Sequence, residues 1–392
     1  MIATAATAKA PVPFWRLSSF YFLYFAQLGV FVPFWTLYLA DRGYDAPTIG
    51  SLMACMMATR IIGPNIWGWL ADKTRQRLLI VRWGIFAACA GFALVFLEWD
   101  FWGLVFVLSL YSFFWNAVLP QVEVITIHSL GEKADFYGRI RLWGSIGFVF
   151  FVVGCGWLFD LIPLDWVPVI MLVQMLGILI CTFTLKPQEE APTKKESSVK
   201  SLLFSVPVIS FLLIGLLMQM SHGPLYFFYS LFLQESGYSK SMIGGLWAVG
   251  VIAEIILFVY MHRLLAIFGA KNLLLLSLVL AAIRWIMIGH WVDSLWILFV
   301  AQLLHAATFG VFHSVSMHFV HSFFGKEHAG QGQSFYASIC YGAGGALGAW
   351  YSGKVWESLG PEICFYSATI INLVAIGVFL FGMRKADTVS ER

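Results

Sequence analysis

The amino-acid sequence predicts an all-α membrane protein of twelve transmembrane helices in two pseudo-symmetric six-helix bundles. Hydrophobic residues make up 60% of the 392-residue chain and charged residues only 11%, against about a quarter in soluble domains. The apolar residues are grouped in runs of about twenty, the length that crosses a bilayer as a helix. The two halves also resemble each other at a constant offset, which pairs Gly138 with Gly332 and Arg77 with Lys271.

Apolar runs between polar residues predict the individual spans. The first six are 14–39, 46–71, 77–97, 101–128, 137–161 and 165–185, and the second six are 203–235, 240–264, 271–290, 293–322, 330–356 and 361–383. The stretch between them is rich in Lys, Glu, Pro and Ser, which is typical of a flexible linker. The predicted domains are an N-terminal bundle (1–185), a cytoplasmic linker (186–200) and a C-terminal bundle (201–392).

The distribution of Lys and Arg predicts the orientation in the membrane. With both termini in the cytoplasm, only Arg42, Lys240 and Lys354 fall on the outer side, whereas Arg60 and Arg284 lie within spans. All the other basic residues then lie inside or at inner helix ends, as the positive-inside rule requires. We therefore expect a multi-pass protein of the bacterial inner membrane. The net charge of +3 comes with no basic run, which argues against a nucleic-acid partner.

Ionisable side chains inside the predicted spans indicate a water-accessible passage, because burying them in lipid is costly. Arg139 and Arg141 point to nearly opposite sides of span five, since two helical steps turn about 200°. Only one of them can face such a passage. Arg60 on span two has two interpretations that the sequence leaves open: it lines the passage, or it pairs with carbonyls or extends to the interface.

The second half carries its own set of ionisable residues. Glu254 on span eight and Arg284 on span nine lie at depths that would let them pair. His305 and His313 on span ten are about 80° apart around the helix, so both are expected to border the passage. Histidine titrates near physiological pH, and a desolvated carboxylate can load and release a proton. Glu254 is therefore the first candidate for proton coupling.

The loop between spans two and three carries the most specific short motif, residues 68–77 (GWLADKTRQR). It resembles the loop signature of the major facilitator superfamily, and Asp72 and Arg77 are predicted to gate one conformation through a breakable ion pair. The alternative interpretation is a solvated basic loop that only sets the topology. Span five opens with a second motif, residues 135–147 (DFYGRIRLWGSIG), which resembles the lactose permease family and, more closely, the bacterial phenylpropionate permease family.

Further stretches that carry this resemblance over nearly the whole chain are 31–35 (FVPFW), 237–239 (GYS), 250–256 (GVIAEII) and 305–309 (HAATF). The resemblance implies a twelve-helix proton symporter for a small organic molecule, with an aromatic carboxylate such as 3-phenylpropionate among the candidates. It selects Arg141 over Arg139, because Glu123 and Arg141 have the spacing of the sugar-binding pair in lactose permeases. Two departures from that family argue against a sugar-permease proton route: Thr308 stands where an acidic residue is expected, and span seven offers Tyr226 and Ser230 where a carboxylate is expected.

The predicted roles follow from these observations. The predicted solute-binding residues are Arg141, Glu123, Trp143, Tyr226 and Arg284, the proton-coupling residues are Glu254, His305 and His313, and the gating residues are Asp72 and Arg77. The alternatives are a proton-coupled sugar or nucleoside permease and a receptor that does not transport. No enzyme motif is present, and we expect neither a metal site nor a cofactor beside the proton gradient. The expected partners are the solute, protons and the lipid bilayer, for a monomeric carrier.

Overall fold

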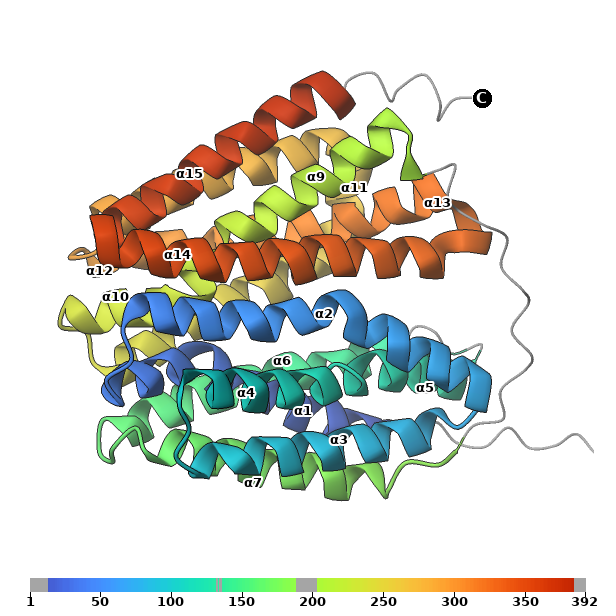
Figure 1. Cartoon of the computed structure of the whole chain (residues 1–392). Helices are drawn as coiled ribbons and strands as arrows, with labels where there is room; N and C mark the ends of the chain where they lie inside the picture. Colours follow the sequence, from blue (N-terminus) through green and yellow to red (C-terminus); the bar gives the residue numbers. More distant parts are fainter. Residues whose placement is uncertain (1–12, 132, 134–135, 188–202, 384–392) are drawn as a thin grey trace, which may run out of the picture.

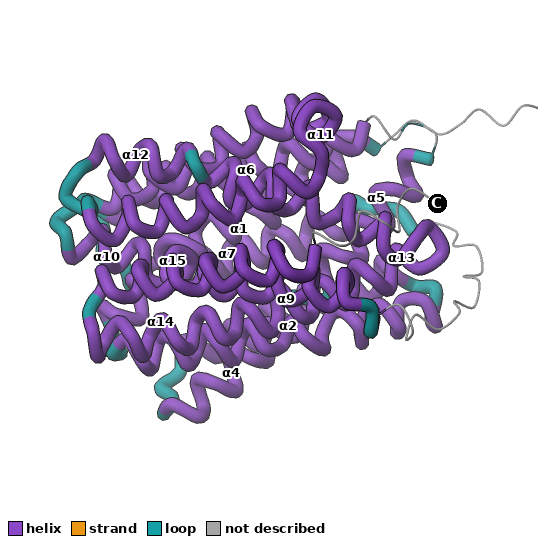
Figure 2. Tube along the Cα trace, turned by 90° about the horizontal axis from the view of Figure 1, so that it is seen from above, coloured by secondary structure: helices purple, strands orange, loops and turns teal. Residues whose placement is uncertain are grey.

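The computed structural model describes residues 13–131, 133, 136–187 and 203–383, and within these ranges helices are joined by short loops (Figure 2). Most of the predicted linker, 186–200, lies outside the described residues. The helices of the first part of the chain are α1 (Phe14–Asp41), α2 (Ala46–Thr74), α3 (Arg77–Ala93), α4 (Phe101–Trp115), α5 (Val118–Leu130), α6 (Phe136–Phe159) and α7 (Trp166–Thr182). A single 3₁₀ turn, Leu94–Phe96, follows α3.

The second part of the chain alternates α-helices with short π-helical segments. Its α-helices are α9 (Val206–Ser221), α10 (Tyr229–Glu235), α11 (Lys240–His290), α12 (Leu295–Leu303), α13 (Phe312–Tyr336), α14 (Gly345–Leu359) and α15 (Pro361–Val378). The π-helical segments are Pro224–Phe228, Ala306–Val311, Ala337–Gly344 and Phe379–Met383.

Several helices begin at residues whose chemistry favours a helix start. The Asp45 carboxylate accepts a hydrogen bond from the Thr48 amide at 2.9 Å, and Asp100 accepts one from the Gly103 amide at 2.8 Å. Such side chains satisfy amides that have no partner within the first turn. These caps place the starts of α2 and α4 within one residue of the positions predicted from the sequence.

Nine helical runs in the described ranges are long and apolar enough to cross a membrane, and Trp166–Thr182 is a shorter apolar helix. The longest run, Lys240–His290, has 51 residues and would extend about 75 Å if straight, well beyond a hydrocarbon core of about 30 Å. Gly269 interrupts it with a φ of 71°, and Gly325 interrupts α13 with a φ of 66°. The breaks fall between the predicted spans 240–264 and 271–290, and between 293–322 and 330–356.

The helices lie roughly side by side, with α1 to α7 in the lower part of Figure 1 and α9, α13, α14 and α15 above them. The loop between α2 and α3 lies at the right of this view, and we call this side the Asp72 end. The loop between α6 and α7 lies at the left, and we call this side the Asp160 end. The two parts meet where α2 packs against α14 and where α6 packs against α11.

Small residues bring these helices into close backbone contact. A Cβ atom at Gly156 of α6 would lie 2.6 Å from the Lys240 carbonyl oxygen of α11, and one at Gly344 would lie 2.6 Å from the Leu216 carbonyl oxygen of α9. Both distances are too short for a larger side chain. Close approach of this kind is how membrane helices gain packing energy without a hydrophobic driving force between them.

Candidate functional site

A cavity of about 300 Å³ lies between the two parts of the chain, bordered by α1, α2 and α6 on one side and by helices of the second part on the other. Its polar lining comprises Thr36, Arg60, Arg141, Ser145, Gln219, Tyr226, Glu254, His305 and Tyr341. Its aromatic lining comprises Phe25, Phe31, Trp35, Phe148, Phe227, Trp247 and Phe309. A largely apolar wall with a few converging polar groups is typical of small-molecule sites.

The π-helical segments bring several of these side chains to the cavity. Tyr226 lies in the segment Pro224–Phe228, Phe309 in Ala306–Val311 and Tyr341 in Ala337–Gly344. A π-helical turn contains an extra residue, so it shifts the direction of the side chains that follow, and such turns are frequent at functional sites. The sequence analysis did not predict them, although Pro224 marks the start of the first.

Arg141 of α6 lines the cavity, as the resemblance predicted, whereas Arg139 is exposed outside it. The Arg141 guanidinium lies over the Phe25 ring at 3.9 Å from its centroid and 5.9 Å from that of Tyr21. An aromatic face attracts a cation and helps to hold it where water is scarce. The helical geometry of span five therefore separates the two arginines as expected.

Glu254 of α11 and His305 face each other across the cavity wall, with 3.8 Å between Glu254 Oε2 and His305 Nε2. Behind them, Arg284 is fully buried and donates hydrogen bonds to four acceptors. These acceptors are the Ala301 carbonyl (2.8 Å), Gln302 Oε1 (3.0 Å), Thr308 Oγ1 (3.0 Å) and His305 Nδ1 (3.1 Å). The guanidinium is therefore surrounded by neutral acceptors of the protein itself.

The predicted pairing of Glu254 with Arg284 is wrong. Arg284 does not line the cavity, and its charge is satisfied by the acceptors above instead of by a carboxylate. The physical reason is position: His305 stands between the two, taking a hydrogen bond from Arg284 through Nδ1 and facing Glu254 with Nε2. Because a guanidinium can only donate, Nδ1 must accept, and the ring proton lies on Nε2 toward the carboxylate.

His305 and His313 lie on one face of their helix, as the sequence predicted. The His305 and Phe309 rings stack at 5.4 Å, and the Phe309 and His313 rings stack at 6.1 Å. His313 Nδ1 lies 3.2 Å from the hydroxyl of Tyr341, which lines the cavity, although His313 itself does not. The two histidines are thus connected by an aromatic ring and not by hydrogen bonds.

With this geometry in view, the comparisons with known proteins identify the family. The family model for the MFS_1 like family matches residues 14–367. The chain belongs to this family of major facilitator transporters. It is 27% identical over 362 residues, 89% of this chain and 93% of the relative, to a probable 3-phenylpropionic acid transporter of Escherichia coli K12. It is 24% identical to the maltose permease of Geobacillus stearothermophilus, covering 95% of both chains.

The solved structures agree in fold. A crystal structure of the nucleoside transporter NupG superposes with a TM-score of 0.80 over 94% of this chain and 98% of that one, at 17% identity. The family and the curated relatives are transporters, so this multi-pass membrane protein is a transporter and not an enzyme.

Besides Arg284, two further predicted solute-binding residues of the transporter, Glu123 and Trp143, lie outside the cavity lining. Glu123 of α5 is mostly buried and close enough to interact electrostatically with Arg141, but it forms no ion pair with it within 4 Å in the described structure. Trp143 is turned toward Trp15 and Phe22, whose ring centroids lie 5.5 and 6.5 Å away. Neither side chain borders the space where a solute fits.

The predicted gating residues of the transporter are in direct contact. Asp72 at the end of α2 forms an ion pair with Arg77 at the start of α3, and Arg77 also donates to Gln121 of α5 at 2.6 Å. Asp72 is exposed whereas Arg77 is buried. The pair therefore fastens the α2–α3 loop to α5 at the Asp72 end.

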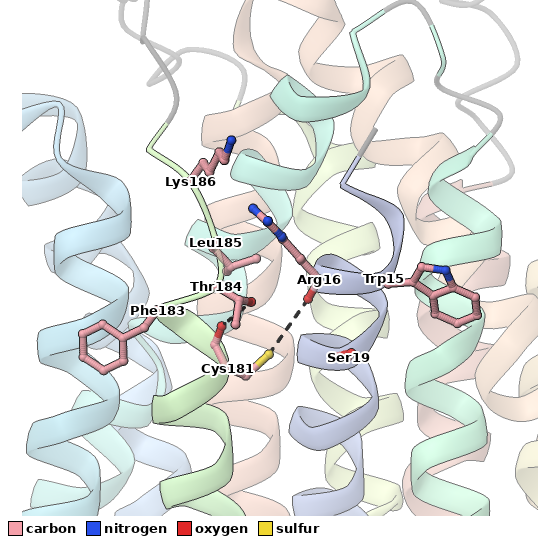
Figure 3. Close-up of a pocket in the computed structure, with 8 residues that line it drawn as sticks. All are labelled: Trp15, Arg16, Ser19, Cys181, Phe183, Thr184, Leu185 and Lys186. Carbon is pink, nitrogen blue, oxygen red and sulfur yellow. Dashed lines mark hydrogen bonds between the residues drawn. The ribbon is translucent and has the colours of Figure 1, made fainter. Parts of the chain in front are cut away.

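A second hollow, of about 540 Å³, lies at the Asp72 end between the tips of α1 and α7 (Figure 3). Its lining is Trp15, Arg16, Ser19, Cys181, Phe183, Thr184, Leu185 and Lys186. None of these is a predicted solute or proton residue, and the hollow shares no lining residue with the central cavity. Among the described residues of the transporter, no group of three or more His, Cys, Asp or Glu side chains is arranged to hold a metal ion.

Proposed function

We propose that this transporter is a proton-coupled symporter that imports a small organic acid with an aromatic body. The observation that carries the proposal is the central cavity, where one carboxylate beside a histidine and two arginines faces a wall of aromatic rings. The carboxylate supplies a proton site, and the arginines supply attraction for an anion. The rings supply contact area for an aromatic solute.

Glu254 is the proposed proton carrier. It is the only carboxylate among the residues that line the cavity, and His305 presents an N–H toward it. A neutral His305 in this tautomer stabilises the ionised carboxylate and leaves room for a proton on it. His305 is therefore proposed to orient the Glu254 carboxylate and to relay its proton, and His313 is proposed to take part in proton coupling next to Tyr341. The proton gradient is the sole proposed energy source.

Arg60 and Arg141 are the two cations of the cavity, and either can receive a carboxylate by bidentate hydrogen bonds. The resemblance to phenylpropionate permeases favours Arg141, with Tyr226 beside the solute. The Escherichia coli relative, a probable 3-phenylpropionic acid transporter, is consistent with an aromatic acid, whereas the maltose permease and the nucleoside transporter NupG keep a sugar and a nucleoside as alternatives. Glu123, which does not line the cavity, is proposed to interact electrostatically with Arg141.

The proposed transport cycle is alternating access between two six-helix bundles, 1–185 and 201–392, with twelve spans in all. We propose that the Asp72 end and both termini face the cytoplasm of a bacterial cell, and that the carrier works as a monomer. Contacts at the Asp160 end, where Asp160 accepts hydrogen bonds from the amides of Lys240 and Ser241, would then close the outer side. The Asp72–Arg77 pair is proposed to break as the inner side opens.

Uptake into proteoliposomes tests the proposal. Purified transporter is given radiolabelled 3-phenylpropionate, maltose or uridine, each with and without an inward proton gradient. Symport of an acid predicts accumulation of 3-phenylpropionate or its aromatic analogues that collapses with an uncoupler. Gradient-driven accumulation of maltose or uridine alone would replace the acid by the corresponding alternative, and binding of a solute without any flux would indicate a receptor.

A further inference from the structure

Arg60 occupies the midpoint of α2, with fourteen residues between it and either end of that helix (Ala46–Thr74). At 1.5 Å per residue, each end is about 21 Å away. An arginine at this depth cannot extend to an interface, so the snorkelling interpretation that the sequence left open does not apply. Its side chain lines the central cavity instead.

The three arginines around the cavity differ in how their charges are balanced. Arg284 donates to four acceptors and does not reach the cavity. Arg141 lies over the Phe25 ring and within electrostatic range of both Glu123 and Glu254. Neither Arg60 nor Arg141 forms a hydrogen bond or an ion pair within the part of the chain that the structure describes, but unlike Arg141, Arg60 acts on neither Glu123 nor Glu254. Its charge is the one that the protein leaves unmatched.

Four phenols lie within electrostatic range of Arg60. Tyr24, Tyr111, Tyr226 and Tyr341 are the side chains on which its charge acts. Tyr226 and Tyr341 line the cavity, and no hydrogen-bond partner for the Tyr226 hydroxyl occurs among the described residues. A guanidinium and a phenol that line the same cavity with free donors form a site for an oxygen anion.

The backbone holds Arg60 in this position. The π-helical segment that carries Tyr341 packs directly on α2 here, and a Cβ at Gly342 would lie 3.2 Å from the Arg60 carbonyl carbon and 3.0 Å from the Ile61 amide nitrogen. One turn further, Asn65 donates a hydrogen bond to Ser338 at 2.9 Å. Arg60 and Tyr341 therefore face the cavity from a fixed contact between the two parts of the chain.

We propose that Arg60, and not Arg141, is the principal anchor for the carboxylate of the solute, with the Tyr226 hydroxyl as an additional donor. This inference rests on the proposed transport of an organic acid, and it gives Arg60 and Arg141 different roles. Because Arg60 is half-buried and has no carboxylate partner among the described residues, an arriving carboxylate gains most there. Arg141, between Glu123 and Glu254, instead balances the charge of the proton-carrying carboxylate. The solute is then an acid whose aromatic body lies against the rings of the cavity.

Binding of an acid and of its neutral amide tests this division. Affinities of 3-phenylpropionate and 3-phenylpropionamide are measured with purified protein by isothermal titration calorimetry for the parent, Arg60→Gln, Arg60→Lys, Arg141→Gln and the matched control Arg139→Gln. The parent and the control should prefer the acid by about 30-fold or more, the scale of a charge-assisted hydrogen-bonded pair. Arg60→Gln should lose this preference, Arg60→Lys should keep a reduced one, and Arg141→Gln should retain it.

Each outcome decides between the hypotheses. If Arg60→Gln still prefers the acid and Arg141→Gln does not, the anchor is Arg141, and the proposed function stands without this inference. If the parent binds acid and amide equally, or binds neither, organic-acid transport itself is refuted and the inference falls with it. If Arg60→Gln fails to fold, as judged by size-exclusion chromatography, Arg60→Lys decides the question. If Arg60→Lys binds the acid as tightly as the parent does and prefers it to the amide by the same factor, a bidentate hydrogen bond from Arg60 to the solute carboxylate is contradicted.

Discussion

Replacing Glu254 by glutamine should separate solute exchange from uphill transport. Glutamine has the size of the protonated side chain and keeps an acceptor for the His305 N–H, so it imitates the loaded state. Since Glu254 is the only carboxylate in the cavity lining, the variant has no group there that can release a proton. We expect it to bind solute and exchange it across the membrane without accumulating it.

The size of the effect follows from the charges of the site. One proton carried with a monovalent acid makes each transport event electrically neutral, so the pH difference alone supplies the energy. One pH unit corresponds to about 1.4 kcal/mol, or a tenfold accumulation ratio. The parent should therefore reach about tenfold accumulation at one unit and about a hundredfold at two, whereas Glu254→Gln should stay near onefold.

The assay uses proteoliposomes with an imposed pH difference and the membrane potential clamped by potassium and valinomycin. Counterflow with preloaded solute measures exchange separately. Glu98→Gln, at an exposed position between α3 and α4, is the matched control and should behave like the parent. Tenfold accumulation by Glu254→Gln would refute the assignment, and parent accumulation that follows the membrane potential would refute the stoichiometry of one proton per monoanion.

Two further predictions concern stability. Although burial acts to raise the pKa of Asp160, hydrogen bonds from Ser241 and from the amides of Lys240 and Ser241 outweigh it and hold that pKa below its usual range. The carboxylate therefore stabilises the α6–α11 contact at neutral pH, and this is lost only as the pH falls through the lowered pKa. At pH 7, Asp160→Asn should lower the Tm by about 2 °C. The control Asp165→Asn, which removes an exposed ion pair with Arg42, should lower it less. An equal effect of the two substitutions would contradict the stabilising role of Asp160. Arg284→Gln should cost at least about 2 kcal/mol of unfolding free energy, because buried acceptors lose their donor. Chemical denaturation against Arg139→Gln measures this, and a fully stable Arg284→Gln that fails to bind solute would instead place Arg284 in direct contact with the solute.

The membrane spans were predictable because a bilayer imposes a simple rule on the sequence. Each crossing needs a long apolar run, and the structure places helices over every predicted span, with breaks at Gly269 and Gly325 between neighbouring ones. That only one of Arg139 and Arg141 faces the cavity was also predictable, since 200° of rotation separates their directions, and the family resemblance selected Arg141, which lines it.

The partners of the ionisable residues were less predictable. Depth along a helix suggested that Glu254 would meet Arg284, but depth does not specify rotation about the helix axis or the side chain that lies between. His305 occupies that place. Trp143 was predicted to contact the solute, yet it lies two residues from Arg141 and therefore on a different face of the helix, against Trp15 and Phe22.

The sequence by itself determined that this chain crosses a membrane many times and keeps charges within it, because hydropathy and charge are properties of residues and need no partner. Only the tertiary structure decided which charges are satisfied. Arg284 has four acceptors, Arg141 has carboxylates nearby and, among the described residues, Arg60 has neither. That difference depends on helices distant in the chain, brought together by α2 packing on α14 and α6 packing on α11. The free energy of a buried charge depends on all its neighbours, so no local stretch of sequence contains it.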